Sequence, residues 1–296
     1  MKNLLTIIIL FAFALITHAQ KFNEVIKESL QFEKQSESNA LIVANINGNV
    51  TVVAHDGPEI LVEVEKQIVA KTDQRLEKGK REVQLGIIDL ADTLILFVKG
   101  PCTSYGQGNQ KYHRNEREGK GWNYNWSGHR DNCMEDYNFK LNFKIMVPSS
   151  VNVHLSTIND GNIEVSGVKA QVYADNINGS IKLTKIAGAT SASTINGDLD
   201  LEYEVNPKSD CRFYSLNGDI NAFFQKGLGA SVSFESFNGD FFTNVNTLES
   251  LPVQLEKETR KEGTKYKING NRYKVGPGGV RLDFETFNGN VYLKEI

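Results

Sequence analysis

The residues best placed to do chemistry in this sequence are three aspartates at a fixed spacing. Asp198, Asp219 and Asp240 each follow a glycine and are separated from one another by 21 residues. If extended strands run straight through these glycines on consecutive turns of a repeat, the three carboxylates point outward in one column. Such a column would raise the pKa values of its members or bind a cation such as calcium. The interpretation we favour is that each carboxylate accepts local hydrogen bonds.

A second candidate is the aromatic group Trp122, Tyr124 and Trp126, whose alternation puts all three rings on one face of an extended backbone. It belongs to residues 101–133, a segment rich in glycine, aromatic and basic residues. Exposed rings can stack on sugars or hold a partner peptide. The other interpretation, with equal support, is that they cover an open edge of a sheet. The basic residues that would suit an anionic glycan are Lys111, Arg114, Arg117, Lys120 and Arg130.

The chain has three cysteines. Cys211 occupies an inward apolar position of the repeat and is expected to be a buried free thiol. Cys102 and Cys133 bracket the aromatic segment, which predicts a disulfide between them. The alternative is a metal site with His113 and His129, but the spacing fits no standard zinc pattern.

Signals of catalysis are weak. The histidines are scattered, and the sequence contains no nucleophile motif, phosphate loop or dinucleotide fingerprint. We therefore expect a non-enzyme without a cofactor. The alternative is a polysaccharide-cleaving enzyme, because carboxylates on neighbouring strands could match the roughly 5 to 9.5 Å spacing of glycosidase acids. A net charge of −3 gives no support to nucleic-acid binding.

A repeated hexapeptide must position these residues. Its clearest copy is Ser215-Leu216-Asn217-Gly218-Asp219-Ile220. From Gly161 to Gly289, the motif glycines are separated by 18, 18, 21, 21 and 50 residues. The remaining copies are residues 45–50, 157–163 (with one extra residue), 176–181, 194–199, 236–241 and 286–291.

Asn-Gly between apolar runs normally indicates a hairpin, but hairpins here would mix apolar and acidic side chains on both faces. We therefore predict that the strand continues straight through the glycine and that the chain turns before the motif, for example at Ser193-Thr194. The apolar column Ile177, Ile195, Leu216 and Phe237 would then point inward. The amides Asn178, Asn196, Asn217 and Asn238 would hydrogen-bond along the axis. The predicted fold is an all-β, single-domain β-solenoid of 18–21-residue rungs.

Three further elements are expected outside the regular rungs. Residues 73–82 favour a short helix. Residues 264–275 predict a hairpin around Asn269-Gly270, with basic side chains on one face. Residues 101–133 form the insert bounded by the predicted disulfide.

The repeated Thr/Ser-apolar-Asn-Gly-Asp-apolar rungs, from about Leu41 to the end, resemble the bacterial putative-adhesin family, the β-strand-repeat domain of unknown function 4097. The resemblance implies a β-solenoid fold and an adhesin-like role. The insert at residues 101–133 lies outside the family pattern.

Residues 1–19 match a secretion signal, with Lys2, an apolar run from Leu4 to Ile16 and a small-residue exit at Ala19. Residues 20–296 then form the mature domain, for which we expect no transmembrane segment and a periplasmic, cell-surface or secreted location. The predicted function is a non-catalytic cell-envelope module, adhesin-like or scaffolding, which binds a cell-surface glycan or an envelope protein through the insert. A purely structural envelope protein is a further alternative.

Overall fold

The computed structural model describes residues 19–100, 102–107, 122–125, 136–252, 255–260, 263–268 and 271–296. Over these residues the chain is all-β except for one helix, α1 (Asp73–Glu82). Most strands belong to two large sheets, of 10 and 11 strands. Residues 1–18 of the predicted signal peptide lie outside the described residues, and of this segment the structure describes Ala19 alone.

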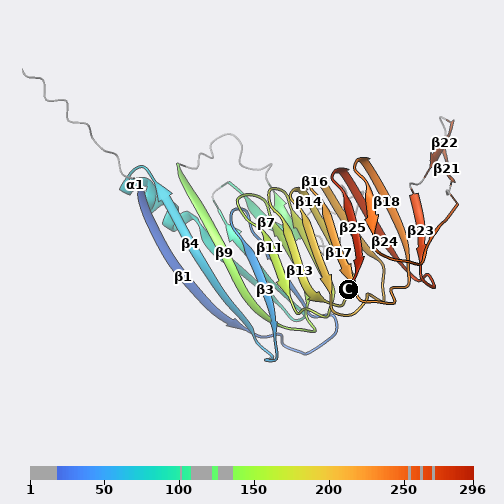
Figure 1. The fold of residues 1–296 in the computed structure, drawn as a ribbon. Coiled ribbons are helices and arrows are strands. Elements are labelled where there is room, and N and C mark those ends of the chain that lie inside the picture. Colours follow the sequence, from blue (N-terminus) through green and yellow to red (C-terminus); the bar gives the residue numbers. More distant parts are fainter. Residues whose placement is uncertain are drawn as a thin grey trace, which may run out of the picture.

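The two sheets are built mainly from rungs. Each rung contributes one strand to each of the two sheets (Figure 1). Neighbouring rungs pair in parallel, and equivalent residues are in register: Ile163 pairs with Ile181, and Leu199 with Ile220. The predicted β-solenoid is therefore confirmed in architecture. In chain order the rungs are β2 (Ala40–Ala44) with β3 (Val50–His55), β10 (Asn152–Thr157) with β11 (Ile163–Ser166), β12 (Val172–Asn176) with β13 (Ile181–Ile186), β14 (Thr190–Asn196) with β15 (Leu199–Tyr203), β16 (Cys211–Asn217) with β17 (Ile220–Phe224), β18 (Ala230–Asn238) with β19 (Phe241–Thr243), and β24 (Val280–Asn288) with β25 (Val291–Glu295).

The chain changes sheet at Asn-Gly itself, so the predicted straight passage through the glycine is wrong. β14 ends at Asn196 in one sheet, and β15 begins at Leu199 in the other. The apolar residue before Asn-Gly consequently points outward. Ile195 is 38% exposed and Phe237 72% exposed, whereas Thr194 is fully buried. The expected inward column of Ile177, Ile195, Leu216 and Phe237 is not part of the core.

Hydrogen bonding explains why a hydroxyl takes the buried position. The Thr194 hydroxyl donates to the carbonyl of Gly179 in the preceding rung at 2.8 Å, and Ser215 donates to Gly197 at 2.8 Å. A buried carbonyl without a donor costs about 1–3 kcal/mol, so an apolar residue is disfavoured at this inward position. The next side chain then points outward.

The rungs do not stack in chain order. β24 lies between β16 and β18, and β25 lies between β17 and β19 (Figure 1). The C-terminal rung, residues 280–296, is thus intercalated between two earlier rungs.

Further strands and α1 cover the end of the solenoid that is formed by the early strands. β9 (Tyr137–Pro148), β4 (Ile60–Ala70) and β1 (Gln20–Leu30) extend one sheet, and β6 (Thr93–Lys99) and β5 (Gln84–Leu90) extend the other. α1 packs against β4, β1 and β9. The edge strand β1 exposes charged side chains such as Lys21, Lys27 and Glu28, which protects the edge from further pairing.

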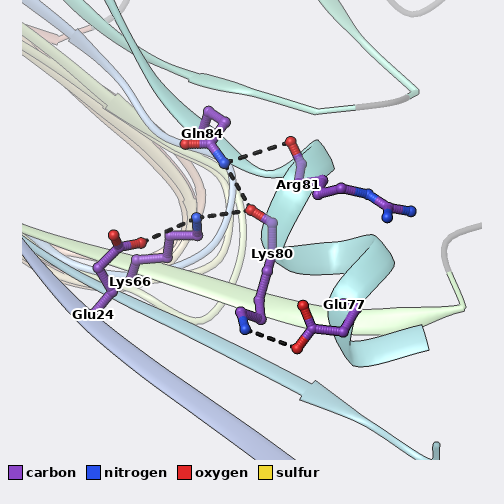
Figure 2. Close-up of polar contacts among 6 residues, drawn as sticks. All are labelled: Glu24, Lys66, Glu77, Lys80, Arg81 and Gln84. Carbon is purple, nitrogen blue, oxygen red and sulfur yellow. Dashed lines mark hydrogen bonds and ion pairs between the residues drawn. The ribbon is translucent and has the colours of Figure 1, made fainter. Parts of the chain in front are cut away.

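A buried lysine holds α1 in place. The Lys66 side chain is 2% exposed, its ammonium lies 3.2 Å from the Glu24 carboxylate, and it donates to the Lys80 carbonyl at 3.2 Å (Figure 2). The Gln84 amide donates to the carbonyls of Lys80 and Arg81. These contacts satisfy the last carbonyls of the helix, where a positive charge is also favourable.

The strands near the C-terminus correct the predicted hairpin at residues 264–275. β22 (Gly263–Ile268) pairs with β21 (Leu255–Arg260), whereas β23 (Asn271–Val275) pairs antiparallel with β18 and with β20 (Leu248–Ser250). Pairing with β18 buries Val275 completely, which a free hairpin could not do.

Cys211 is confirmed as a buried free thiol, 3% exposed. Tyr203 donates to its sulfur at 3.4 Å. Burial raises the pKa of the Cys211 thiol above its usual value.

The motif glycines are expected to tolerate no side chain. A Cβ on Gly197 would lie 2.4 Å from the Gly179 carbonyl oxygen, whereas a Cβ on Gly106 would meet nothing within 4 Å. Gly197→Ala should lower the free energy of unfolding by about 1–3 kcal/mol. Gly106→Ala is the control and should change it little. Urea denaturation measures both, and equal stability of the two variants would contradict the close packing of rungs.

The two faces of the repeat should respond differently to truncation. Phe213 is fully buried, so Phe213→Ala should cost about 3–5 kcal/mol. Phe237→Ala should cost about 1 kcal/mol or less, because most of this ring is already in water. Thermal denaturation of both variants is the measurement, and a large loss for Phe237→Ala would restore the inward assignment.

The Cys211 thiol should resist alkylation. A raised pKa lowers the thiolate fraction at a given pH, and burial blocks access. Iodoacetamide at pH 8 should label Cys211 only in unfolding concentrations of urea, as followed by peptide mass spectrometry. Rapid labelling of Cys211 in the native protein would show that this part of the core opens.

Candidate binding surfaces

The described part of the insert is a two-stranded ribbon on the outer face of the 11-stranded sheet. β7 (Ser104–Gln107) pairs antiparallel with β8 (Trp122–Asn125). Tyr105 stacks on Phe97 of β6 with ring centroids 4.7 Å apart, and Trp122 stacks beside Tyr105 at 6.0 Å. Phe97 belongs to a small outer cluster with Ile42, Ala44 and Ile95. The ribbon therefore covers a sheet face.

Tyr124 anchors the ribbon to the solenoid. Its hydroxyl accepts from the Val98 backbone N–H at 2.9 Å and donates to the Ala44 carbonyl at 2.8 Å. These groups lie just where the pairing of β2 with β6 stops. Burial raises the pKa of Tyr124 above its usual value. Tyr124 is thus held in place by hydrogen bonds to the sheet. Trp122 and Tyr124 are both partly exposed and pack on the outer cluster.

Other residues of the insert lie outside the described residues. These are Trp126, the basic residues Lys111, Arg114, Arg117, Lys120 and Arg130, and also Cys133, His113 and His129. The Cys102–Cys133 disulfide and the shared face of the three aromatic rings therefore stay predictions.

The three predicted aspartates belong to a longer acceptor column at the corner. In this column a side-chain oxygen of each rung accepts the backbone N–H of the next rung: Asp198 accepts from Asp219 at 2.9 Å, and Asp219 from Asn290 at 2.7 Å. Asn290 in turn accepts from Asp240 at 3.0 Å. In spatial order the column is Asn142, Asn49, Asn162, Ser180, Asp198, Asp219, Asn290 and Asp240.

This order corrects the expected stack of three acids on consecutive rungs, because Asn290 separates Asp219 from Asp240. Asp198 and Asp219 accept hydrogen bonds, but from the backbone of the next rung, 21 and 71 residues away, and not locally as we had favoured. Among the described residues, no group of three or more His, Cys, Asp and Glu side chains is placed to hold a metal ion.

A second column at the same corner is built from amides. Each side-chain NH2 donates to the amide oxygen of the preceding rung, for example Asn196 to Asn178 at 2.8 Å and Asn217 to Asn196 at 3.0 Å. The predicted bonding along the axis is confirmed, with Asn288 inserted between Asn217 and Asn238. The amide column comprises Asn159, Asn178, Asn196, Asn217, Asn288 and Asn238.

An apolar ridge that was not predicted from the sequence lies beside these columns. From Ile158 onward, the apolar residue of each described motif copy is exposed or partly exposed, whereas Ile46 of the first copy is buried. Phe237 and Phe287 stack with centroids 4.8 Å apart. The ridge comprises Ile158, Ile177, Ile195, Leu216, Phe287 and Phe237. Its outward direction follows from the buried hydroxyls, which the straight-strand interpretation had placed outside.

The last rung, formed by β18 and β19, has an open corner. Among the described residues, β23 covers β18 from Ala230 to Phe234, and β19 is the last strand of its sheet. A hollow of about 580 Å³ lies there, and its walls include Phe241, Tyr273, Glu235 and Asp240. We call residues 236–243 of this rung the open corner.

One observation bears on membrane association. Among the described residues, no helix combines the length and the apolar character needed to cross a bilayer.

Comparison with solved structures finds two that are similar to this chain over most of its length. A putative cell adhesion protein from Clostridium sporogenes ATCC 15579 is 8% identical with a TM-score of 0.44, over 94% of this chain and 100% of that chain. A putative adhesin from Bacteroides fragilis NCTC 9343 is 12% identical with a TM-score of 0.35, over 92% of this chain and 97% of that chain. Comparison with curated proteins gives no match. The family model of Toastrack DUF4097 matches residues 149–291, which hold most of the regular rungs, in agreement with the predicted resemblance.

Proposed function

We propose that this protein is an exported, non-catalytic β-solenoid of the cell envelope that acts as an adhesin-like or scaffolding module. One observation carries the proposal: the polar side chains of the repeat are used in bonds between rungs. Asn196 and Asn217 belong to the amide column, and Asp198 and Asp219 hold the next backbone N–H. Side chains with these bonds build a scaffold, so recognition falls to surfaces that interrupt the repeat.

The ribbon of β7 and β8 is the first such surface. Tyr124 is fixed by its two bonds to the sheet, so the ribbon has a defined position. The partly exposed Trp122 ring lies beside Tyr105 on a rigid support. A fixed aromatic ring can stack on the apolar face of a sugar without losing much side-chain entropy. We therefore propose a cell-surface glycan as the ligand and Trp122 as a contact residue.

Export rests on the predicted signal peptide, residues 1–19. In the periplasm or outside the cell, the Cys102–Cys133 disulfide would fix the base of the insert. The ribbon would then present its rings on a closed loop.

The proposal is tested on a glycan array with the mature protein, residues 20–296. Trp122→Ala should weaken glycan binding by about tenfold, because loss of one ring stack removes roughly 1–1.5 kcal/mol. The melting temperature should change little, since the ring is only partly buried. Binding that survives Trp122→Ala unchanged would contradict the assignment of Trp122.

Tyr124→Phe is the matched control in the same strand. It removes the two hydroxyl bonds and should destabilise the protein by about 1–2 kcal/mol while glycan binding persists. Release of new reducing ends from the bound glycans would instead identify a polysaccharide-cleaving enzyme. Absence of both binding and cleavage would leave a purely structural envelope protein.

A further inference from the structure

The open corner differs from every other rung in the bonds that end there. Within the described residues, no hydrogen bond reaches the carboxylate of Asp240, which is the last member of the acceptor column. Asn238 donates to Asn288, but no described group donates to its own amide oxygen. The columns that join rungs throughout the solenoid thus stop at unused acceptors.

Backbone groups end in the same way. In the two preceding rungs, the motif glycine N–H donates to the asparagine carbonyl of the next rung: Gly218 to Asn288 at 3.0 Å, and Gly289 to Asn238 at 3.0 Å. By the same parity, the N–H of Gly239 points off the open corner, where the described strands include no further rung to receive it. The N–H of Phe241 occupies the place from which Ile220 and Val291 donate at 2.9 Å. The open corner therefore offers donors and acceptors in the spacing of one more rung.

Apolar surface accompanies these groups. Phe237 packs one face on Phe287 and is 72% exposed, so its other face can take a further side chain of the apolar ridge. Phe242 is 46% exposed beside Tyr292. The opposite end of the solenoid carries the charged edge strand β1, which discourages pairing. Only the open corner combines unused backbone groups with exposed aromatic rings among the described ends of the two sheets.

We propose that the open corner binds an extended segment of a partner polypeptide that contains an apolar-Asn-Gly-Asx turn. The segment adds the corner and the second strand of a further rung, beside β19, because β23 already occupies the edge of β18 from Ala230 to Phe234. The segment's Asx N–H donates to Asp240, its Asn side chain to Asn238, and its apolar residue covers Phe237. Addition of a strand to a free edge is a recognised mode of peptide binding.

The stacking geometry gives the site a specificity for glycine. A Cβ on Gly289 would lie 2.0 Å from the Gly218 carbonyl oxygen, and a Cβ on Gly239 would lie 1.8 Å from that of Gly289. A segment stacked on Gly239 in the same way must approach its carbonyl equally closely. The ligand's own glycine is therefore required, and alanine there should prevent docking.

The C-terminal rung shows that this docking needs no short covalent connection. Residues 280–296 dock on the rung of Asp219 although Asn290 and Asp219 are 71 residues apart in sequence, and Asn290 still donates to Asp219 at 2.7 Å. The same rung meets β18, 50 residues away, through the amides of Asn238 and Asn288. The columns and the strand ladders together therefore hold a rung without a short connection.

A synthetic peptide with the sequence of residues 285–296 is the probe, because this segment already docks on the corner and second strand of an equivalent rung and omits the residues for which β23 leaves no room. Fluorescence anisotropy of the labelled peptide with the intact mature protein should show saturable binding. The same peptide with Gly289→Ala should bind about tenfold more weakly or not at all, because roughly 1.4 kcal/mol corresponds to tenfold. Equal binding of both peptides would overturn the proposal.

Protein variants locate the site. Asp240→Ala and Phe237→Asp should each weaken peptide binding by about tenfold. Asp240→Asn keeps an acceptor oxygen and should bind normally. Asp198→Ala makes the same truncation at an interior rung and should leave binding unchanged, with folding of each variant checked by thermal melting. Peptide binding that Asp240→Ala does not weaken would place the peptide elsewhere and overturn the proposal.

Analytical ultracentrifugation tests the other occupant, a second copy of this chain. We expect a monomer whose sedimentation does not change in Thr243→Pro, a substitution at the free edge of β19. A dimer that Thr243→Pro dissociates, together with an absence of peptide binding, would show that the edge is used for self-association and would overturn the proposal. The glycan experiment on Trp122 is independent of these results.

Discussion

Direct contact between glycine backbones at the corner is the constraint on which the structure depends. Parallel rungs stack at the normal strand spacing only if nothing projects between them where the chain changes sheet. The glycine at each corner leaves room for the carbonyl oxygen of its neighbour, which would lie within about 2 Å of a Cβ at Gly179, Gly218 and Gly289. Around this contact a buried hydroxyl, an exposed amide and an acceptor oxygen hold the rungs together. The residues of the hexapeptide therefore each make a contact with a neighbouring rung.

The architecture could be predicted because periodicity and side-chain parity leave few alternatives. Hairpins at Asn-Gly would have exposed half of the apolar residues, and parallel rungs do not. The phase of the motif could not be predicted by assigning every inward position to an apolar side chain. Thr194 and Ser215 are buried because they hydrogen-bond carbonyls of the preceding rung. Only a count of buried carbonyls at the corner, rather than hydrophobicity, would have placed Ile195 outside.

The candidate sites also differ in whether they could be predicted from the sequence. The amide column was predictable because it needs only equal spacing. Tyr124 could not be separated from Trp122 by alternation alone, since both point to one face of the ribbon. Their difference comes from Val98 and Ala44, which present free backbone groups to the Tyr124 hydroxyl where the pairing of β2 with β6 ends. Long-range contacts of this kind have no local sequence signal.

The order of the rungs is the feature that the repeat spacing predicts least well. Rungs that carry the same motif present similar contact groups, so the motif does not specify which rung is the neighbour. The intercalated C-terminal rung shows the consequence. The connection from β17 to β18 must pass the intercalated rung of β24 and β25. The Glu295 carboxylate fixes this connection by accepting hydrogen bonds from the N–H groups of Gly227 and Leu228 at 3.0 Å. β18 and β19 therefore reach their final neighbours only after residue 295 has joined the stack. A solenoid of interchangeable rungs keeps its order through such connections, and where they stop, at Gly239 and Asp240, its surface retains the capacity to accept another rung.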